Sequence, residues 1–127
     1  SALKWKRGNS HSLFRLIGKG KFECNISVPL ILEYEKILFD PALKIRITNE
    51  EIDKILDFLC ANSRHHKIYF LWRPFLKDVK DDMILELAVS SKSDYILTFN
   101  KKDFVGVKKF GIQVLTPKEI LEKLGEI

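Results

Sequence analysis

Four polar residues carry the chemistry that this sequence suggests: Glu33, Asp81, Asn100 and Asp103. Three of them are carboxylates, and Asn100 offers an amide oxygen. Clustered oxygen ligands suit hard cations such as Mg²⁺ or Mn²⁺, which can generate a hydroxide and stabilise the entering and leaving oxygens of a phosphodiester. The set therefore points to a metal-assisted site, provided that the fold brings the four residues together.

The elements that would position these residues alternate along the chain. Apolar runs predict strands at 22–27, 67–72, 95–99 and 112–115. Helical spacing and capping signals predict helices near 9–17, 29–38 and 48–61, and further helices opening at Asp81-Asp82 and at Thr116-Pro117. Alternating strands and helices predict an α/β fold with a mainly parallel sheet covered on both faces.

In open parallel sheets, ligands bind beyond the carboxyl ends of the strands. Glu33 lies in the helix after the first predicted strand, and Asp81 opens the helix after the second. Asn100 directly follows the third strand, and Asp103 comes three residues later. We therefore expect all four residues at one edge of the sheet.

Each residue also has a purely structural interpretation. Asp81 can act as a helix cap, which satisfies the helix backbone and its dipole. Glu33 can be a solvated helix residue, and Asn100 and Asp103 are common turn formers. From the residues alone, the acidic site and this structural reading both stay open.

Three ordered segments resemble the PIN-domain family. Residues 26–35 are similar to the family's strand ending in serine and the helix that bears its second acid. Residues 78–88 are similar to its acid-led helix ending in Leu-Ala, and residues 93–104 resemble its strand ending in Thr-x-Asp with a following Asp-Phe turn. The resemblance runs from Ser1 to about Ile120, and it is the ordered set of segments that is specific.

The resemblance implies a three-layer α/β/α sandwich and a Mg²⁺- or Mn²⁺-dependent endoribonuclease, of the kind that serves as toxin in prokaryotic toxin-antitoxin pairs. It assigns the second acid to Glu33 and the third to Asp81, with Asp82 as the neighbouring candidate ligand. Asn100 stands where aspartate is usual, so a metal would be held more weakly unless Asp103 compensates. RNA, a cognate antitoxin and a second copy in a homodimer are the implied partners.

The family begins with a strand ending in Asp-Thr-Asn, and Ser1-Ala2-Leu3 looks like the residues just after that motif. We expect the coding sequence upstream to supply this central strand and its aspartate, and the chain without them to be nearly inactive. The alternative is a PIN-like module that binds RNA or a protein while its metal site has decayed.

Composition sets the remaining bounds. The 127 residues are 46% hydrophobic and 31% charged, which predicts one folded domain spanning 1–127. No apolar run reaches the roughly 20 residues of a membrane span, and no export leader is visible, so we expect a cytoplasmic protein. The net charge of +5 favours an anionic partner, although the basic residues are dispersed.

The candidates for RNA contact are Trp5, Lys6 and Arg7 near the start, and Lys101 and Lys102 beside the proposed site. Aromatic rings stack on bases and lysines hold phosphates, although lysines in a turn are usually just solvated. The pair His65-His66 lacks a Cys or His partner at ligand spacing and is read as a polar loop. Cys24 and Cys60 are read as free buried thiols.

Overall fold

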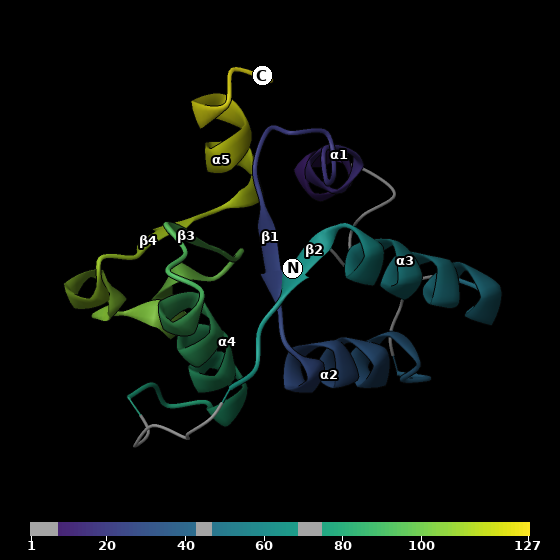
Figure 1. Ribbon diagram of the computed structural model, residues 1–127, viewed down its shortest axis with the longest axis horizontal. Helices are drawn as coiled ribbons and strands as arrows, with labels where there is room; N and C mark the ends of the chain where they lie inside the picture. Colours follow the sequence, from purple (N-terminus) through teal and green to yellow (C-terminus); the bar gives the residue numbers. More distant parts are fainter. Residues whose placement is uncertain (1–7, 43–46, 69–74) are drawn as a thin grey trace.

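The protein is described from a computed structural model, which describes residues 8–42, 47–68 and 75–127. Helices and short strands alternate along the chain (Figure 1), which agrees with the predicted α/β class. The helices and 3₁₀ turns are α1 (Gly8–Arg15), α2 (Val28–Leu38), α3 (Asn49–Ala61), α4 (Val79–Ser90), η2 (Lys101–Phe104), η3 (Val107–Phe110) and α5 (Pro117–Lys123). The strands are β1 (Cys24–Ile26), β2 (Ser63–His65), β3 (Tyr95–Leu97) and β4 (Gln113–Leu115).

The described strands form two parallel pairs. β1 pairs with β2 in the register Cys24↔Ser63, and β3 pairs with β4 in the register Tyr95↔Gln113. The described residues therefore form two separate pairs of strands, and they do not form the single sheet of a three-layer sandwich. Each of the four strands instead has one edge that no described strand covers.

The hydrogen bonds show which residues face the uncovered side of β1. The Ile26 carbonyl accepts a hydrogen bond from the His66 N–H at 2.9 Å, so the backbone groups of Ile26 point toward β2. In a parallel ladder, neighbouring residues direct their backbone groups to opposite sides. The N–H and C=O of Asn25 therefore point away from β2.

The same argument applies to β3. The Thr98 N–H donates to the Leu115 carbonyl at 2.9 Å, and the Asp94 carbonyl accepts from Gln113 at 3.0 Å. Alternate residues on this strand therefore face β4, which leaves Tyr95 and Leu97 to direct their backbone groups the other way.

One side chain links the two pairs of strands. The amide nitrogen of Asn25 donates to the Ser93 hydroxyl at 3.0 Å, and its Oδ1 lies 2.7 Å from His66 Nε2. Ser93 leads into β3, and His66 follows β2. Asn25 thus connects three segments that lie far apart in the sequence.

Each half of the fold has its own apolar cluster. One lies around α4, β3 and the 3₁₀ turns, and its buried members are Leu76, Leu85, Ala88, Ile96, Phe104, Val107 and Ile112. The other joins α2 to α3 through Leu38, Ile52 and Leu56. Among the helices of the described ranges, none is long and apolar enough to cross a membrane.

Two sequence-based boundaries were wrong. The second strand was predicted at 67–72 after a polar break, but β2 lies at Ser63–His65, and the described residues Lys67 and Ile68 are not in a strand. Residues 69–72 of that prediction lie outside the described residues. Pairing with β1 makes a strand of polar residues there, because tertiary contacts override local propensity.

The second error concerns the start of α4. Asp78, not Asp81, is the N-cap, and its carboxylate accepts a hydrogen bond from the Lys80 N–H at 2.8 Å. The helix therefore begins earlier than predicted, and Asp81 lies within its first turn.

Candidate functional site

Glu33 is held by a helix with a well-formed start. The Ser27 side chain accepts a hydrogen bond from the Leu30 N–H at 3.3 Å, and Pro29 stands in the first turn, where its missing N–H costs nothing. This start directs α2 away from the carboxyl end of β1. Glu33 lies one turn further along, with only 16% of its side chain exposed.

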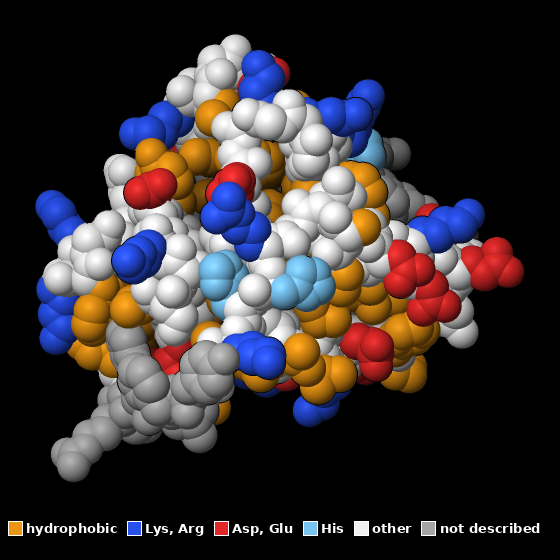
Figure 2. All heavy atoms as spheres, in the orientation of Figure 1, with side chains coloured by type: hydrophobic (Ala, Val, Ile, Leu, Met, Phe, Trp, Pro, Cys, Tyr) orange, Lys and Arg blue, Asp and Glu red, His pale blue; other side chains and the backbone are white. Residues whose placement is uncertain are grey.

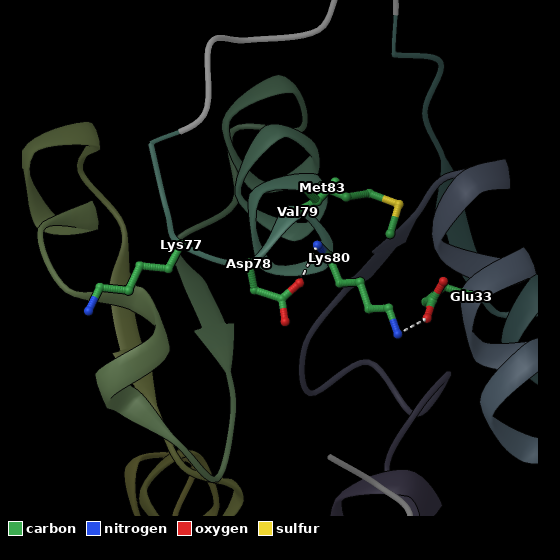
Figure 3. Close-up of a pocket in the computed structure, with 6 residues that line it drawn as sticks. All are labelled: Glu33, Lys77, Asp78, Val79, Lys80 and Met83. Atoms are coloured by element: carbon green, nitrogen blue, oxygen red, sulfur yellow. Dashed lines mark hydrogen bonds and ion pairs between the residues drawn. The ribbon is translucent and has the colours of Figure 1, made fainter.

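Glu33 is paired with a cation from another helix. Lys80 Nζ, on α4, lies 3.0 Å from Glu33 Oε1, as Figure 3 shows. This oxygen is buried, and Lys80 is the partner that the described part of the chain gives it. The ion pair with Lys80 is therefore what balances its charge.

The pair stands at a hollow of about 590 Å³ between α2 and the start of α4 (Figure 3). Its lining residues are Glu33, Lys77, Asp78, Val79, Lys80 and Met83. Asp81, Asn100 and Asp103 are not in this lining. Of the four residues predicted to share one pocket, this hollow therefore contains only Glu33.

Asp81 is a candidate ligand whose pKa is raised by its surroundings. Partial burial is the largest cause of a raised pKa at Asp81. The negative charge of Asp103 raises this pKa further, and so do the charges of Asp78 and Asp82. Asp81 and Asp103 come from different elements, so the fold gathers acidic charge that is dispersed in the sequence.

Asp82 has a structural task. Its Oδ1 accepts hydrogen bonds from the Leu76 N–H at 2.8 Å and from the Phe75 N–H at 3.1 Å. These bonds hold the segment before α4 against the first turn of that helix. Of the two adjacent aspartates, Asp81 is thus the one whose carboxylate is better placed for a ligand.

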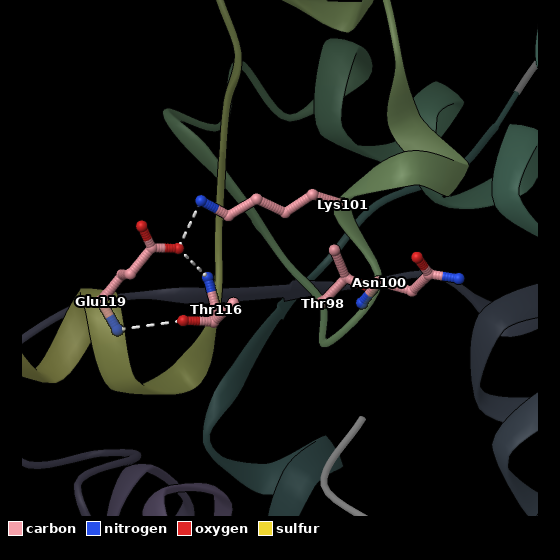
Figure 4. Close-up of polar contacts among 5 residues, drawn as sticks. All are labelled: Thr98, Asn100, Lys101, Thr116 and Glu119. Carbon is pink, nitrogen blue, oxygen red and sulfur yellow. Dashed lines mark hydrogen bonds and ion pairs between the residues drawn. The ribbon is translucent and has the colours of Figure 1, made fainter.

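Asn100 lies at the carboxyl end of β3, just before η2. Its backbone N–H donates to the Thr98 hydroxyl at 3.1 Å, and its exposed side chain makes no capping bond to η2 (Figure 4). Asp103 is exposed within η2, and its N–H donates to the Asn100 carbonyl at 3.1 Å. One short turn therefore presents both side chains.

The two lysines of this turn differ. Lys101 forms an ion pair with Glu119, and Figure 4 shows it reaching toward α5 while the Asn100 amide points the other way. Lys102 is exposed. Trp5, Lys6 and Arg7 lie outside the described residues. Lysine and arginine side chains are dispersed over the face in Figure 2 and form no single basic block there.

The donor chemistry fits a hard divalent cation. Glu33, Asp81 and Asp103 offer carboxylate oxygens, which are ligands that such a cation prefers. The positions of these side chains fit a metal ion less well than their chemical type does. Within the described ranges, no group of three or more His, Cys, Asp or Glu side chains is placed to hold a metal ion.

Comparison with known proteins identifies the family. A PIN domain model matches residues 1–102, and the chain belongs to the PIN domain family. PIN domains are commonly nucleases and generally use divalent metal ions. The match includes Glu33, Asp81 and Asn100 and ends just before Asp103. No curated protein and no solved structure matches the chain significantly.

Sequence reasoning missed Lys80 as the partner of Glu33. No local pattern could have found this contact, because the two residues come together only when α2 and α4 pack against each other. Asp78 was missed as the N-cap of α4, although Asp is a favoured residue at that position.

Proposed function

We propose that this protein is a divalent-metal-dependent endoribonuclease in which Glu33, Asp81 and Asp103 hold Mg²⁺ or Mn²⁺ and Asn100 contributes a neutral oxygen. Bound there, the cation would supply the positive charge that stabilises phosphodiester hydrolysis. The protein's own contribution is to hold the carboxylates and the RNA in position. The proposed RNA contacts are Lys102 and the segment that contains Trp5, Lys6 and Arg7. Lys101 would join them when its ion pair with Glu119 breaks.

The interaction between Asp81 and Asp103 carries this proposal. Burial raises the pKa of Asp81 most, and the negative charge of Asp103, which comes from a separate element, raises it further. Such crowding disfavours the apoprotein and is offset when a cation binds, which is why clustered acids with raised pKa values mark functional sites. Membership of the PIN domain family supports the same interpretation.

We further propose that the two strand pairs are halves of one sheet in a three-layer sandwich, completed by a strand that lies between β1 and β3 and ends in an aspartate. The backbone groups of Asn25, Tyr95 and Leu97, which point away from their partner strands, support this proposal. Adding an apolar strand ending in Asp-Thr-Asn before Ser1 should slow hydrogen exchange at these three amides. Unchanged exchange at all three would reject the added strand.

The proposed biological role is that of a toxin in a toxin-antitoxin pair. An antitoxin that covers the acidic site and a homodimer are the corresponding partners. A direct test is whether the protein restored with the Asp-Thr-Asn strand arrests growth when expressed alone and whether its Asp81→Asn variant does not.

A binding module without catalysis is the alternative, and one observation favours it. The part of the chain that the structure describes holds no ready group of three metal-binding side chains. A module of this kind would bind single-stranded RNA equally well with EDTA and with Mn²⁺, and it would leave the RNA intact.

Cleavage of a labelled single-stranded RNA with Mn²⁺, Mg²⁺ and EDTA separates the two functions. Under the nuclease proposal, the protein restored with the Asp-Thr-Asn strand cleaves RNA, and Asp81→Asn or Glu33→Gln in that restored protein lowers metal-dependent cleavage at least about a hundredfold, because each removes a ligand charge while keeping the side-chain shape. His65→Ala is the matched control, because His65 is exposed and bonds only to the Cys60 carbonyl among the contacts described. Equal cleavage by the restored protein and its Asp81→Asn variant would favour the binding module.

A further inference from the structure

The ion pair between Lys80 and Glu33 occupies a position that the proposed metal also needs. Glu33 Oε1 is buried and lies 3.0 Å from the Lys80 ammonium. An ammonium and a divalent cation are drawn to the same carboxylate oxygen, and their like charges repel each other. Both cannot be held at that oxygen together.

The two partners differ in their freedom to move. Glu33 is mostly buried on α2, whereas 57% of the Lys80 side chain is exposed. Lysine carries its charge on a flexible stem, so the ammonium can leave Glu33 for water without a change in the helix backbone.

Resting on the proposed function, we propose that Lys80 is an internal counter-ion that occupies Glu33 in the metal-free protein and is displaced when a divalent cation binds there. Lys80 thus sets the metal affinity of the site. It stabilises the metal-free fold by neutralising Glu33, and it opposes metal binding by the same contact. A high metal concentration is then needed before the site fills.

This role differs from that of a simple link between α2 and α4. A link would lower stability when removed and would leave the metal response unchanged. Removing a counter-ion should instead lower the stability of the metal-free protein and raise its metal affinity. The reason is that the free energy which the ion pair contributes without metal is lost when metal binds.

Lys80→Met tests the proposal, since methionine keeps the apolar stem and removes the charge. Mn²⁺ binding is measured by titration calorimetry and by thermal melts in EDTA and in Mn²⁺. Lys80→Met should bind Mn²⁺ about three- to fivefold more tightly, which is the fold-change expected from one partly exposed ion pair. Its melting temperature should fall in EDTA and should rise more than that of the wild type when Mn²⁺ is added.

Two further variants serve as the control and as a test of the ligand assignment. Lys77→Met is the matched control, because Lys77 lines the same hollow but points away from Glu33 in Figure 3. It should change Mn²⁺ affinity less than twofold by the same scale. Glu33→Gln tests the proposed function itself and should weaken Mn²⁺ binding.

The outcomes separate the two proposals. If Glu33→Gln weakens Mn²⁺ binding and Lys80→Met binds no more tightly than the wild type, the counter-ion role is overturned while Glu33 remains a ligand. If Glu33→Gln leaves binding unchanged, the ligand assignment fails, and the counter-ion role fails with it. Absence of Mn²⁺ binding in both the wild type and Lys80→Met also overturns the counter-ion role, whereas binding only in Lys80→Met supports it.

Discussion

The carboxylate of Asp103, in η2, acts on Asp81 in the first turn of α4, and its negative charge raises the pKa of the Asp81 carboxyl above the ordinary value of 3.8. Burial is the larger cause of the same shift. The pair therefore has a cost in folding stability whenever both carboxylates are ionised, and this cost can be measured without any metal.

Asp81→Asn should raise the melting temperature of the metal-free protein by about 2 °C near neutral pH, as expected for a change worth about half a kcal/mol. A raised pKa means that the folded state binds a proton more readily than the unfolded state. The stability that protonated Asp81 gives the folded state is therefore fully present below about pH 3.8, the ordinary pKa of the group. It is lost as the pH rises through the raised pKa of the folded state. The asparagine variant lacks this loss, so its advantage should shrink as pH falls. Melts of both proteins from about pH 4 to about pH 7 measure it, and an advantage independent of pH would contradict the assignment.

Asp82→Ala should have the opposite effect on stability. It leaves the N–H groups of Phe75 and Leu76 without their acceptor, which costs about 1–3 kcal/mol if they stay unsatisfied. Chemical denaturation reports the change. Asp82→Asn is the control, because its Oδ1 can still accept both bonds, and it should lose much less stability than the alanine variant. Equal losses in the two variants would show that the two hydrogen bonds are not the cause.

Prediction from sequence succeeded where a local signal determines the structure. The predicted capping box of Thr48 with Glu51 is present, and α5 opens with the predicted N-cap Thr116 and first-turn Pro117, so both helices begin where these signals place them. A capping box is formed within four residues, so the sequence contains all of its parts.

Features that depend on long-range pairing were not predictable in this way. β2 is a strand because β1 lies beside it, although Ser63, Arg64 and His65 have no strand pattern of their own. Lys80 meets Glu33 because two helices pack together, and no spacing rule links them. The candidate acids were chosen from the carboxyl ends of the predicted strands and from the family's ordered motifs, but their partners were visible only in the structure.

Asn25→Ala should destabilise the protein by about 1–3 kcal/mol, because the amide joins β1 to Ser93 and to His66. Its loss leaves the partly buried His66 Nε2 without its described partner, while Ser93 keeps its other side-chain contact. Denaturant unfolding gives the value. Glu23→Ala is a suitable comparison, because it removes only the exposed ion pair between Glu23 and Arg64 and should cost about 0.5 kcal/mol or less. If both variants lose the same stability, the Asn25 bridge has no special weight.

Glu119→Gln should raise the affinity for single-stranded RNA by about twofold, because it frees Lys101 to contact phosphate and removes a negative charge nearby. The Lys101 ammonium is the main cause of the lowered pKa of Glu119, so this carboxylate is ionised at neutral pH. Glutamine preserves the capping box, and α5 should stay folded. Fluorescence anisotropy at several salt concentrations reports the change. Glu122→Gln removes the same charge from an exposed position of α5 and should have a smaller effect. Equal effects would indicate a general charge effect and no specific role for Lys101.

Asn100→Asp should tighten Mn²⁺ binding about tenfold, since it adds a carboxylate at the carboxyl end of β3 in a position where the family pattern has aspartate. The exposed side chain makes no capping bond, so the change should leave the fold intact. If Asp103 compensates for the neutral Asn100, Asp103→Asn will weaken Mn²⁺ binding strongly in the wild-type background and only slightly beside Asn100→Asp. Calorimetric titration of the two single variants and the double variant measures this coupling. Additive effects would show that Asp103 and Asn100 act independently, and tighter binding in Asp103→Asn would remove Asp103 from the proposed ligands.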